Sequence, residues 1–288
     1  MQDAVRTRSL SRRWRFLCSC SSNLCFDLNS VLGINYSKYS PRIYQLFSEH
    51  KSKFIMGVDQ FLRFCSVPKL EAFKVKFFLG NEAKLHIDRW VDLALGMETE
   101  TISLSLYFLP DVDRYNFPCH LLPPDGRASH LKHLRLKSCT LTPSPDYAKR
   151  LSSMVTLRLS FVPLSQFHLD TILSGCSNLE WLKLVRCFLP KYLCVSGPSL
   201  LLKSLIIDDR NDKGFVRMEL NSLHKLHTFE YSGPVRKFTF VDVPALKIIF
   251  FQFSNKGGVG TRSVFNELAK DVHDLELLSL KFIPFEVC

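Results

Sequence analysis

Apolar residues recur along this chain in short alternating segments. Residues 131–141 (LKHLRLKSCTL) fit the pattern L-x-x-L-x-L-x-x-N/C-x-L at every position, and residues 179–189 (LEWLKLVRCFL) fit it as well. In each copy the central x-L-x-L-x segment alternates between polar and apolar side chains, which predicts a β-strand with two leucines on one face. Two strands of the same kind are therefore expected, each buried on one side only.

Weaker copies of the pattern occur before, between and after these two. They begin at Leu70, Met154, Leu202, Leu226, Leu246 and Leu275. Residues 102–106 (ISLSL) form a further expected strand, whose register against the other copies is left open. From Leu131 to Leu275 the first positions of successive copies are 23, 25, 23, 24, 20 and 29 residues apart. This spacing matches the period of leucine-rich repeats, roughly 20–29 residues.

A single strand of this kind cannot bury its leucines alone, and stacked repeats form a parallel sheet that the returning segments cover on one side. The predicted fold class is therefore α/β: a leucine-rich-repeat solenoid with a curved parallel sheet and helical or irregular return segments. Cys139 and Cys187 occupy the N/C position of the pattern, and we interpret them as buried structural thiols.

Three segments between the strands have the spacing of amphipathic helices. Residues 166–174 and 86–95 each place apolar side chains on one helical face. Residues 52–65 form the clearest stripe, with apolar positions at i, i+3/i+4 and i+7. We expect this last helix to cap the N-terminal repeat, because the end of a solenoid must be covered.

Composition and charge narrow the class of protein. The 288 residues are 46% hydrophobic and carry a net charge of +11, which excludes a mainly disordered chain. No apolar stretch is long enough to span a bilayer, so no membrane partner is expected. The positive charge permits an acidic partner, and no nucleic acid is expected. The basic N-terminus lacks the apolar run of a secretory signal, so the ten cysteines are interpreted as reduced thiols in a cytoplasmic or nuclear protein.

Candidate catalytic and ligand-binding motifs are weak. Residues 256–263 (KGGVGTRS) resemble a phosphate-binding loop, but Thr261 stands where the lysine is required, so we interpret the loop as a turn between repeats. Neither Cys18-x-Cys20 nor His224-x-x-His227 has the second ligand pair of a structural zinc site. We predict no metal, no cofactor and no catalytic residue, hence no enzyme.

The face of the sheet opposite the leucines is the predicted binding surface. In each repeat the residue between the two core positions points outward; in chain order these are Lys74, Arg135, Arg158, Lys183, Ile206, Glu230, Phe250 and Ser279. Arg135, Arg158 and Lys183 would form a ladder of like charges beside Trp181, and such a ladder favours an anionic partner. The hypothesis is an acidic or phosphorylated target segment on this face. The alternatives are a solvated face, or a contact through Ile206 and Phe250.

The N-terminus carries a resemblance to a known family. Residues 3–15 (DAVRTRSLSRRWR) resemble the second half of a plant F-box, and residues 23–27 (NLCFD) resemble the short strand that follows it. The segments RWV at 89–91, YNFPC at 115–119 and SGCSNLE at 174–180 are also similar to plant F-box/leucine-rich-repeat proteins.

This resemblance implies a non-catalytic substrate-recognition subunit of a Skp-cullin-F-box type ubiquitin ligase. It assigns Val5, Leu10, Trp14 and Leu17 to the interface with the Skp-type adaptor or to the small F-box core. The chain begins inside the motif, so the alternative is a repeat module that no longer engages the ligase. The expected domains are an F-box remnant at 1–22, a linker strand with the capping helix at 23–66, and the repeats at 67–288.

Overall fold

The computed structural model of the protein describes residues 22–35, 43–65, 69–107, 113–125, 129–197, 200–210, 215–254 and 272–283, together with residues 264 and 268. The F-box positions Val5, Leu10, Trp14 and Leu17 and the glycine-rich loop at 256–263 lie outside these residues. The chain forms two compact units. The first contains Met1–Leu122 and Ser129–Thr140, and the second contains Pro123–Ala128 and Leu141–Cys288.

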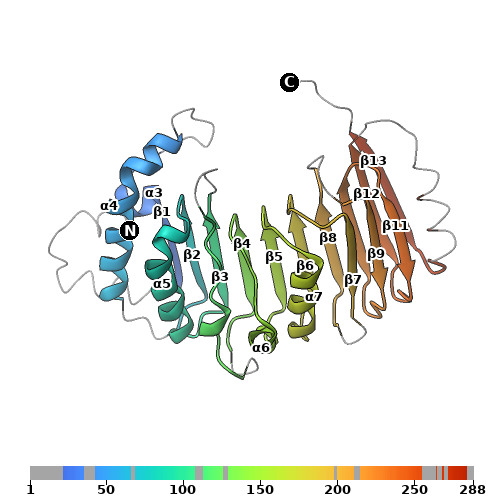
Figure 1. Cartoon of the computed structure of the whole chain (residues 1–288), viewed down its shortest axis with the longest axis horizontal. Coiled ribbons are helices and arrows are strands. Elements are labelled where there is room, and N and C mark those ends of the chain that lie inside the picture. Colours follow the sequence, from blue (N-terminus) through green and yellow to red (C-terminus); the bar gives the residue numbers. More distant parts are fainter. Residues whose placement is uncertain are drawn as a thin grey trace. The chain divides into compact units, whose positions relative to one another are not determined.

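The first unit is built on four parallel strands. These are β1 (Asn23–Asp27), β2 (Ala72–Phe77), β3 (Thr101–Leu106) and β4 (His133–Lys137), each paired with the next (Figure 1). Leu24, Phe73, Ile102 and Leu134 stand in one row, and all four are buried. The pairing settles the register that the sequence leaves open, because Ile102 is the counterpart of Phe73 and Leu134.

Helices follow the strands of the first unit. They are α3 (Leu28–Leu32), α4 (Ile43–Arg63), the 3₁₀ turns η1 (Asn81–Ala83) and η2 (Cys119–Leu121), and α5 (Lys84–Gly96). Helix α5 confirms the expectation for residues 86–95, since Ile87, Trp90, Val91 and Ala94 are its buried residues.

Helix α4 begins nine residues earlier than its apolar stripe predicts, at Ile43 rather than residue 52. The added turns carry the polar run Ser48–Lys51, and the buried residue among them is Phe47, seven positions before Phe54. Phe47 and Phe54 contact Phe77 of β2, with ring centroids 4.7 and 4.0 Å away. The polar run at 48–53 (SEHKSK) separates Phe47 from Phe54 and interrupts the apolar stripe, so the stripe alone places the start of the helix too late. The capping role of this helix stays a prediction.

The main sheet of the second unit continues the same plan. Its strands are β5 (Thr156–Ser160), β6 (Trp181–Val185), β8 (Ser204–Asp208), β10 (Thr228–Gly233), β12 (Ile248–Ser254) and β13 (Leu277–Ile283). Each runs parallel to its neighbour in this order. The strands occur where the repeat copies predict them, and Leu157, Leu182, Leu205, Phe229 and Ile249 form one buried row.

The return segments of the second unit are helical at first and then extended. The first two contain α6 (Pro145–Ala148) with η4 (Lys149–Leu151), and α7 (Gln166–Gly175), which confirms the helix expected at 166–174. The next three contain β7 (Tyr192–Ser196), β9 (Arg217–Asn221) and β11 (Lys237–Val241), which form a second parallel sheet in the order β7-β9-β11. The sequence predicts helical or irregular segments here, and the structure has strands instead.

Aromatic side chains fill the space between the two sheets of the second unit. Phe229 and Tyr231 of β10 lie 5.8 and 5.0 Å from Phe238 of β11, and Phe251 of β12 lies 5.2 Å from it, measured between ring centroids. All four rings are buried. Extended return strands present alternate side chains to this layer, which explains why these segments are strands.

The turn that follows a strand has the same form in several repeats. Ser138, Phe161 and Arg186 directly follow β4, β5 and β6 and have left-handed φ values of 58°, 55° and 49°. The next residue then points into the core, as Cys139 and Cys187 do. The Sγ atom of Cys139 lies 3.4 Å from the carbonyl oxygen of Lys137. The burial of Cys139 and Cys187 is thereby confirmed. Burial also raises the pKa of Cys139 to about 12, as expected for a structural thiol.

Candidate functional site

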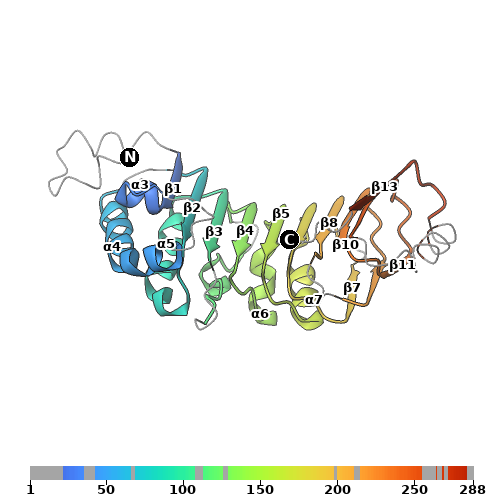
Figure 2. The same ribbon diagram turned by 90° about the horizontal axis from the view of Figure 1, so that it is seen from above.

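One face of each main sheet is covered and the other is open. In the second unit α6, α7 and the sheet β7-β9-β11 lie on one side of the strands, and in the first unit α4 and α5 do so (Figure 2). The alternation of burial along the strands agrees: Leu157 and Leu159 of β5 are buried, whereas Arg158 between them is exposed. The open face of each unit is therefore lined by the polar positions of the repeat pattern.

In the second unit, the predicted outward residues form one continuous row across the open face. Cross-strand pairing places in this row Arg158, Lys183, Ile206, Glu230, Phe250 and Ser279. Its first two residues are basic, the third is apolar and the fourth is acidic. The fifth, Phe250, is 37% exposed. The open face is thus chemically mixed along its length.

The basic pair of this row is formed by Arg158 and Lys183, which are direct cross-strand partners. The described residues include no ion-pair partner for either side chain, so their like charges face solvent together. Arg135 of the predicted three-charge ladder belongs to β4 in the first unit. Within the second unit the ladder is therefore a pair.

The apolar candidates Trp181 and Phe250 are not brought together. Trp181 is 49% exposed at the start of β6 and pairs with Thr156 and Ser204. The strands β8 and β10 separate β6 from β12, which carries Phe250. The two rings therefore offer separate contact points on the same face.

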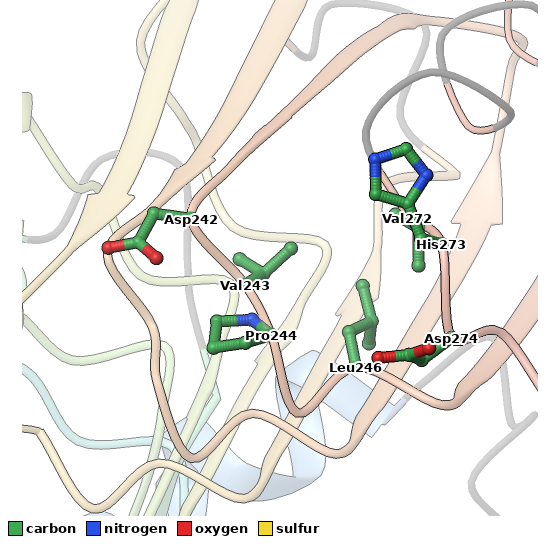
Figure 3. Close-up of a pocket in the computed structure, with 7 residues that line it drawn as sticks. All are labelled: Asp242, Val243, Pro244, Leu246, Val272, His273 and Asp274. Atoms are coloured by element: carbon green, nitrogen blue, oxygen red, sulfur yellow. The ribbon is translucent and has the colours of Figure 1, made fainter.

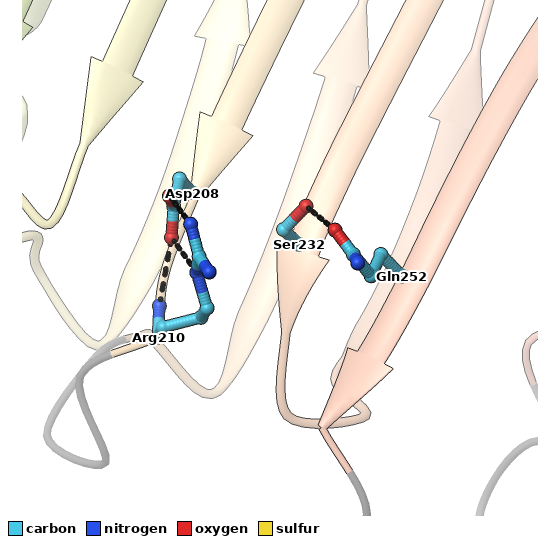
Figure 4. Close-up of polar contacts among 4 residues, drawn as sticks. All are labelled: Asp208, Arg210, Ser232 and Gln252. Carbon is cyan, nitrogen blue, oxygen red and sulfur yellow. Dashed lines mark hydrogen bonds and ion pairs between the residues drawn. The ribbon is translucent and has the colours of Figure 1, made fainter. Parts of the chain in front are cut away.

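Two polar contacts lie near the C-terminal ends of β8, β10 and β12 (Figure 4). Arg210 donates two hydrogen bonds to Asp208, with Nε–Oδ1 at 2.8 Å and Nη2–Oδ2 at 2.5 Å. Ser232 donates a hydrogen bond to Gln252 over 3.1 Å. Burial alone would raise the pKa of Asp208, but the hydrogen bonds and charge of Arg210 outweigh it and hold the pKa below its usual value.

The residue that follows β8, Asp209, is a second acidic group that was not among the predicted site residues. Asp209 is 1% exposed and forms an ion pair with Arg236 over 3.3 Å. Burial raises the pKa of Asp209 to about 6, against the opposing charge of Arg236. The two residues are 27 positions apart and belong to no motif, so no signal in the pattern pointed to them.

The open face of the first unit carries two rows of polar side chains. The first row is Cys25, Lys74, Ser103 and Arg135, and the second is Asp27, Lys76, Ser105 and Lys137. Lys74 and Arg135 occupy the predicted outward position. Lys76, Ser103 and Ser105 were not among the predicted outward residues. The alternating KVK, SLS and RLK segments indicate which side chains share a face, but the open register of residues 102–106 left the neighbours of the two serines undefined.

The second unit also has a cavity of about 220 Å³ at the turns before β12 and β13. Figure 3 shows Asp242 and His273 on opposite sides of it, with Val243 and Pro244 between them. The Asp242 carboxylate lies 2.7 Å from Nε2 of His224. The titratable groups do not converge, and the described part of the chain contains no cluster of three or more metal-ligating side chains.

No helix in the described part of the chain combines the length and the apolar character that crossing a membrane requires.

Comparison with known proteins gives one family match. The profile of the At1g61320/AtMIF1 family, LRR domain, matches residues 62–283, which includes every strand from β2 to β13.

Curated relatives are similar along much of the chain. The putative F-box/LRR-repeat protein At5g54820 of Arabidopsis thaliana is 25% identical over 83% of this chain and 49% of its own length. F-box/LRR-repeat protein 25 of the same plant is 29% identical over 72% of this chain and 68% of its own length. F-box/FBD/LRR-repeat protein At1g78750, also from Arabidopsis thaliana, is 29% identical over 72% of this chain and 43% of its own length. The matched part of the chain thus spans between 43% and 68% of the length of these relatives. No solved structure matches it significantly.

Proposed function

Because this chain belongs to the At1g61320/AtMIF1 family of leucine-rich-repeat domains and is similar to plant F-box/LRR-repeat proteins, we propose that it is a substrate-recognition subunit of a Skp-cullin-F-box type ubiquitin ligase. The proposed role is non-catalytic. The repeats hold a target protein, and the N-terminal segment engages the Skp-type adaptor.

The open face of the sheets is the observation that carries this proposal. Among the described residues, helices and the second sheet cover one side of the strands only (Figure 2). The other side presents an unbroken row from Arg158 to Ser279 with basic, apolar and acidic members. A surface that mixes exposed aromatic anchors with charged groups suits a protein partner, because anchors supply affinity and charges supply specificity.

The proposed mechanism is one of positioning. A target held on the repeats is kept near the transferring subunits of the ligase, so its effective concentration there is raised without any chemistry in this chain. Val5, Leu10, Trp14 and Leu17 are the positions proposed to contact the adaptor or to complete the F-box core. Cytoplasmic or nuclear location is part of the same proposal, because cullin ligases act there.

The experiment is a quantitative affinity purification from plant cells with the proteasome inhibited. The chain is compared with an open-face variant that carries Arg158→Glu and Phe250→Ala, and the adaptor is quantified in both samples. A set of proteins retained by the chain and lost by the variant, with equal adaptor in both, supports the proposal. Equal retention of every co-purifying protein shows that the open face does not hold the target.

A second experiment distinguishes a subunit of the ligase from a repeat interaction module that does not engage the ligase. The same purification is run with a version whose F-box is completed at its N-terminus. If only that version retains the adaptor, the chain as given is a repeat interaction module outside the ligase.

A further inference from the structure

The first unit contains a compact basic surface that the proposed function does not yet explain. We define the basic-serine patch as Lys74 and Lys76 of β2, Ser103 and Ser105 of β3, and Arg135 and Lys137 of β4. Cross-strand pairing places Ser103 directly between Lys74 and Arg135, and Ser105 directly between Lys76 and Lys137. All six side chains alternate with buried core residues, so they point to the open face.

Strand geometry gives the dimensions of the patch. Neighbouring strands are about 4.8 Å apart, and residues two positions apart on a strand are separated by about 6.7 Å. The four cations therefore occupy the corners of a rectangle of roughly 10 by 7 Å, with two hydroxyl groups along its middle. Lysine and arginine side chains are long enough to bend inward over the serines from all four corners.

Three of the four cations of the patch have no carboxylate partner: within the described ranges, Lys74, Lys76 and Arg135 have no ion pair. Glu100, which precedes β3, lies 3.7 Å from Lys69 and 3.9 Å from Lys132, and both of these lysines are outside the patch. One carboxylate borders the patch, since Asp27 stands in the row of Lys76; its Oδ1 accepts a hydrogen bond from the Ser30 backbone N–H over 2.8 Å at the start of α3.

Two titratable groups beside the patch reflect its positive potential. Burial lowers the pKa of His133, and Arg135 lowers it further. Burial raises the pKa of the Cys25 thiol; Lys76 opposes that rise, the carboxylate of Asp27 adds to it, and Lys74 opposes it. Lys137 also lies 4.7 Å from the centroid of the Tyr107 ring, which holds one corner of the patch in place.

We propose that the basic-serine patch binds the phosphate group of a phosphorylated segment of the target protein. This inference rests on the proposed function, since the segment would belong to the protein held by the repeats. A phosphate brings nearly two negative charges and three acceptor oxygens, and the patch offers four cations and two hydroxyl donors on one flat surface. Bound phosphate would relieve the repulsion among the four like charges.

A phosphate fits this surface better than the other anions. A single carboxylate has two acceptor oxygens and one charge, so it would leave three of the four positive charges uncompensated, whereas a phosphate would leave about two. A nucleic acid or an anionic membrane requires a basic surface that extends over many residues. Within the first unit the patch covers three strands and is bounded on β1 by Cys25 and Asp27.

The test uses the full chain and three pools of short synthetic peptides. Each pool has random flanking positions around one fixed residue, which is phosphoserine, serine or glutamate. Retention on the immobilised chain is measured at physiological salt. We expect the phosphoserine pool to be retained at least tenfold more than the serine pool. We expect it to be retained clearly more than the glutamate pool.

Matched variants locate the site. Lys74→Gln combined with Arg135→Gln should abolish the preference for phosphoserine. Lys191→Gln combined with Lys237→Gln, at two exposed lysines of the second unit that lie outside the open-face row, should preserve it. Thermal unfolding of both variants checks that the fold is intact. The milder pair Ser103→Ala and Ser105→Ala should reduce the preference several-fold.

Several results would overturn the proposal. These are equal retention of the serine and phosphoserine pools, equal retention of the glutamate pool, or a preference that survives Lys74→Gln with Arg135→Gln. Binding to phosphatidylserine-containing vesicles that is lost in the same variant would assign the patch to a membrane surface instead.

Adaptor binding is measured on the same preparations. Absence of adaptor binding while phosphoserine binding is intact contradicts the ligase role alone. Absence of phosphoserine binding while adaptor binding is intact contradicts the phosphate site alone.

Discussion

Asp209 forms an ion pair with Arg236 in which one carboxylate oxygen has no partner. Nη2 of Arg236 lies 3.3 Å from Oδ2 of Asp209, while Oδ1 is buried without a hydrogen bond among the described residues. The neighbouring Tyr231 hydroxyl donates to the carbonyl oxygen of Pro234 over 2.7 Å. A buried, half-satisfied carboxylate is costly when ionised, and this cost makes stability depend on pH.

The first prediction concerns that pH dependence. Burial raises the pKa of Asp209 from 3.8 to about 6 in the folded state, so the folded state binds a proton more readily than the unfolded state. The stabilisation of the folded state that comes from protonating the Asp209 carboxyl group is therefore complete below about pH 4. It is lost as the pH rises through 6. The expected loss is about 3 kcal/mol, since each pKa unit corresponds to about 1.4 kcal/mol.

Urea unfolding of the wild type and of Asp209→Asn between pH 4 and pH 7.5 measures this effect. Asparagine does not ionise, so the other carboxylates cancel in the comparison. The stability of the variant relative to the wild type should rise by about 3 kcal/mol across this range. A difference that stays constant with pH would show that Asp209 titrates normally.

The second prediction concerns the contact between α4 and α5. Nε1 of Trp90 donates a hydrogen bond to Oδ1 of Asp59 over 2.6 Å, and Nδ1 of His86 lies 2.7 Å from Oδ2. Trp90 is fully buried, so Asp59→Ala would leave its N–H without a partner and cost about 1–3 kcal/mol. Chemical denaturation should show this loss, and Asp92→Ala on the exposed side of α5 should change stability by less than about 0.5 kcal/mol. Equal effects would mean that the Trp90–Asp59 bond adds nothing.

The third prediction tests the alternation of core and open face. Leu184 of β6 is fully buried, and its neighbour Lys183 points to the open face. Leu184→Ala should destabilise the protein by about 2–5 kcal/mol, whereas Lys183→Ala should stay within about 0.5 kcal/mol of the wild type. Thermal and urea unfolding of the two variants compare adjacent positions on one strand. A large loss at Lys183 together with a small one at Leu184 would reverse the assignment of the faces.

The fourth prediction concerns two glycines at helix ends. A Cβ atom at Gly175, the last residue of α7, would overlap the backbone carbonyl group of Ala148 in α6. A Cβ atom at Gly96, the last residue of α5, would have no neighbouring atom within 4 Å. Gly175→Ala should therefore destabilise by at least about 2 kcal/mol through overpacking, while Gly96→Ala should be neutral or slightly stabilising. Unfolding temperatures of the two variants give the comparison, and a tolerated Gly175→Ala would contradict the close approach of α6 and α7.

The regular spacing of the leucines was sufficient to predict the strands and their two faces. Leu184 inside and Lys183 outside follow directly from a period of two on a half-buried strand. Trp90 was placed in the core by the helical spacing of residues 86–95. These predictions succeeded because each depends on neighbours in the chain.

Other features depend on the alignment of distant segments and were not predictable. The sequence left the register of Ile102 open, so it did not place Ser103 between Lys74 and Arg135. The basic-serine patch could therefore not be predicted from the sequence. The strands β7, β9 and β11 are five residues long, and their extended form depends on their pairing with one another across the second sheet. Asp209 and Arg236 meet only through the turn after β10, which no repeat pattern describes.

Binding of the purified chain to the purified Skp-type adaptor is the most direct measurement of the ligase role. Size-exclusion chromatography and calorimetry should detect a complex of one chain with one adaptor. Trp14→Ala combined with Leu17→Ala should abolish it without changing the unfolding temperature of the repeats. The absence of a complex with the chain as given, or a complex that survives the double substitution, would contradict the proposed role.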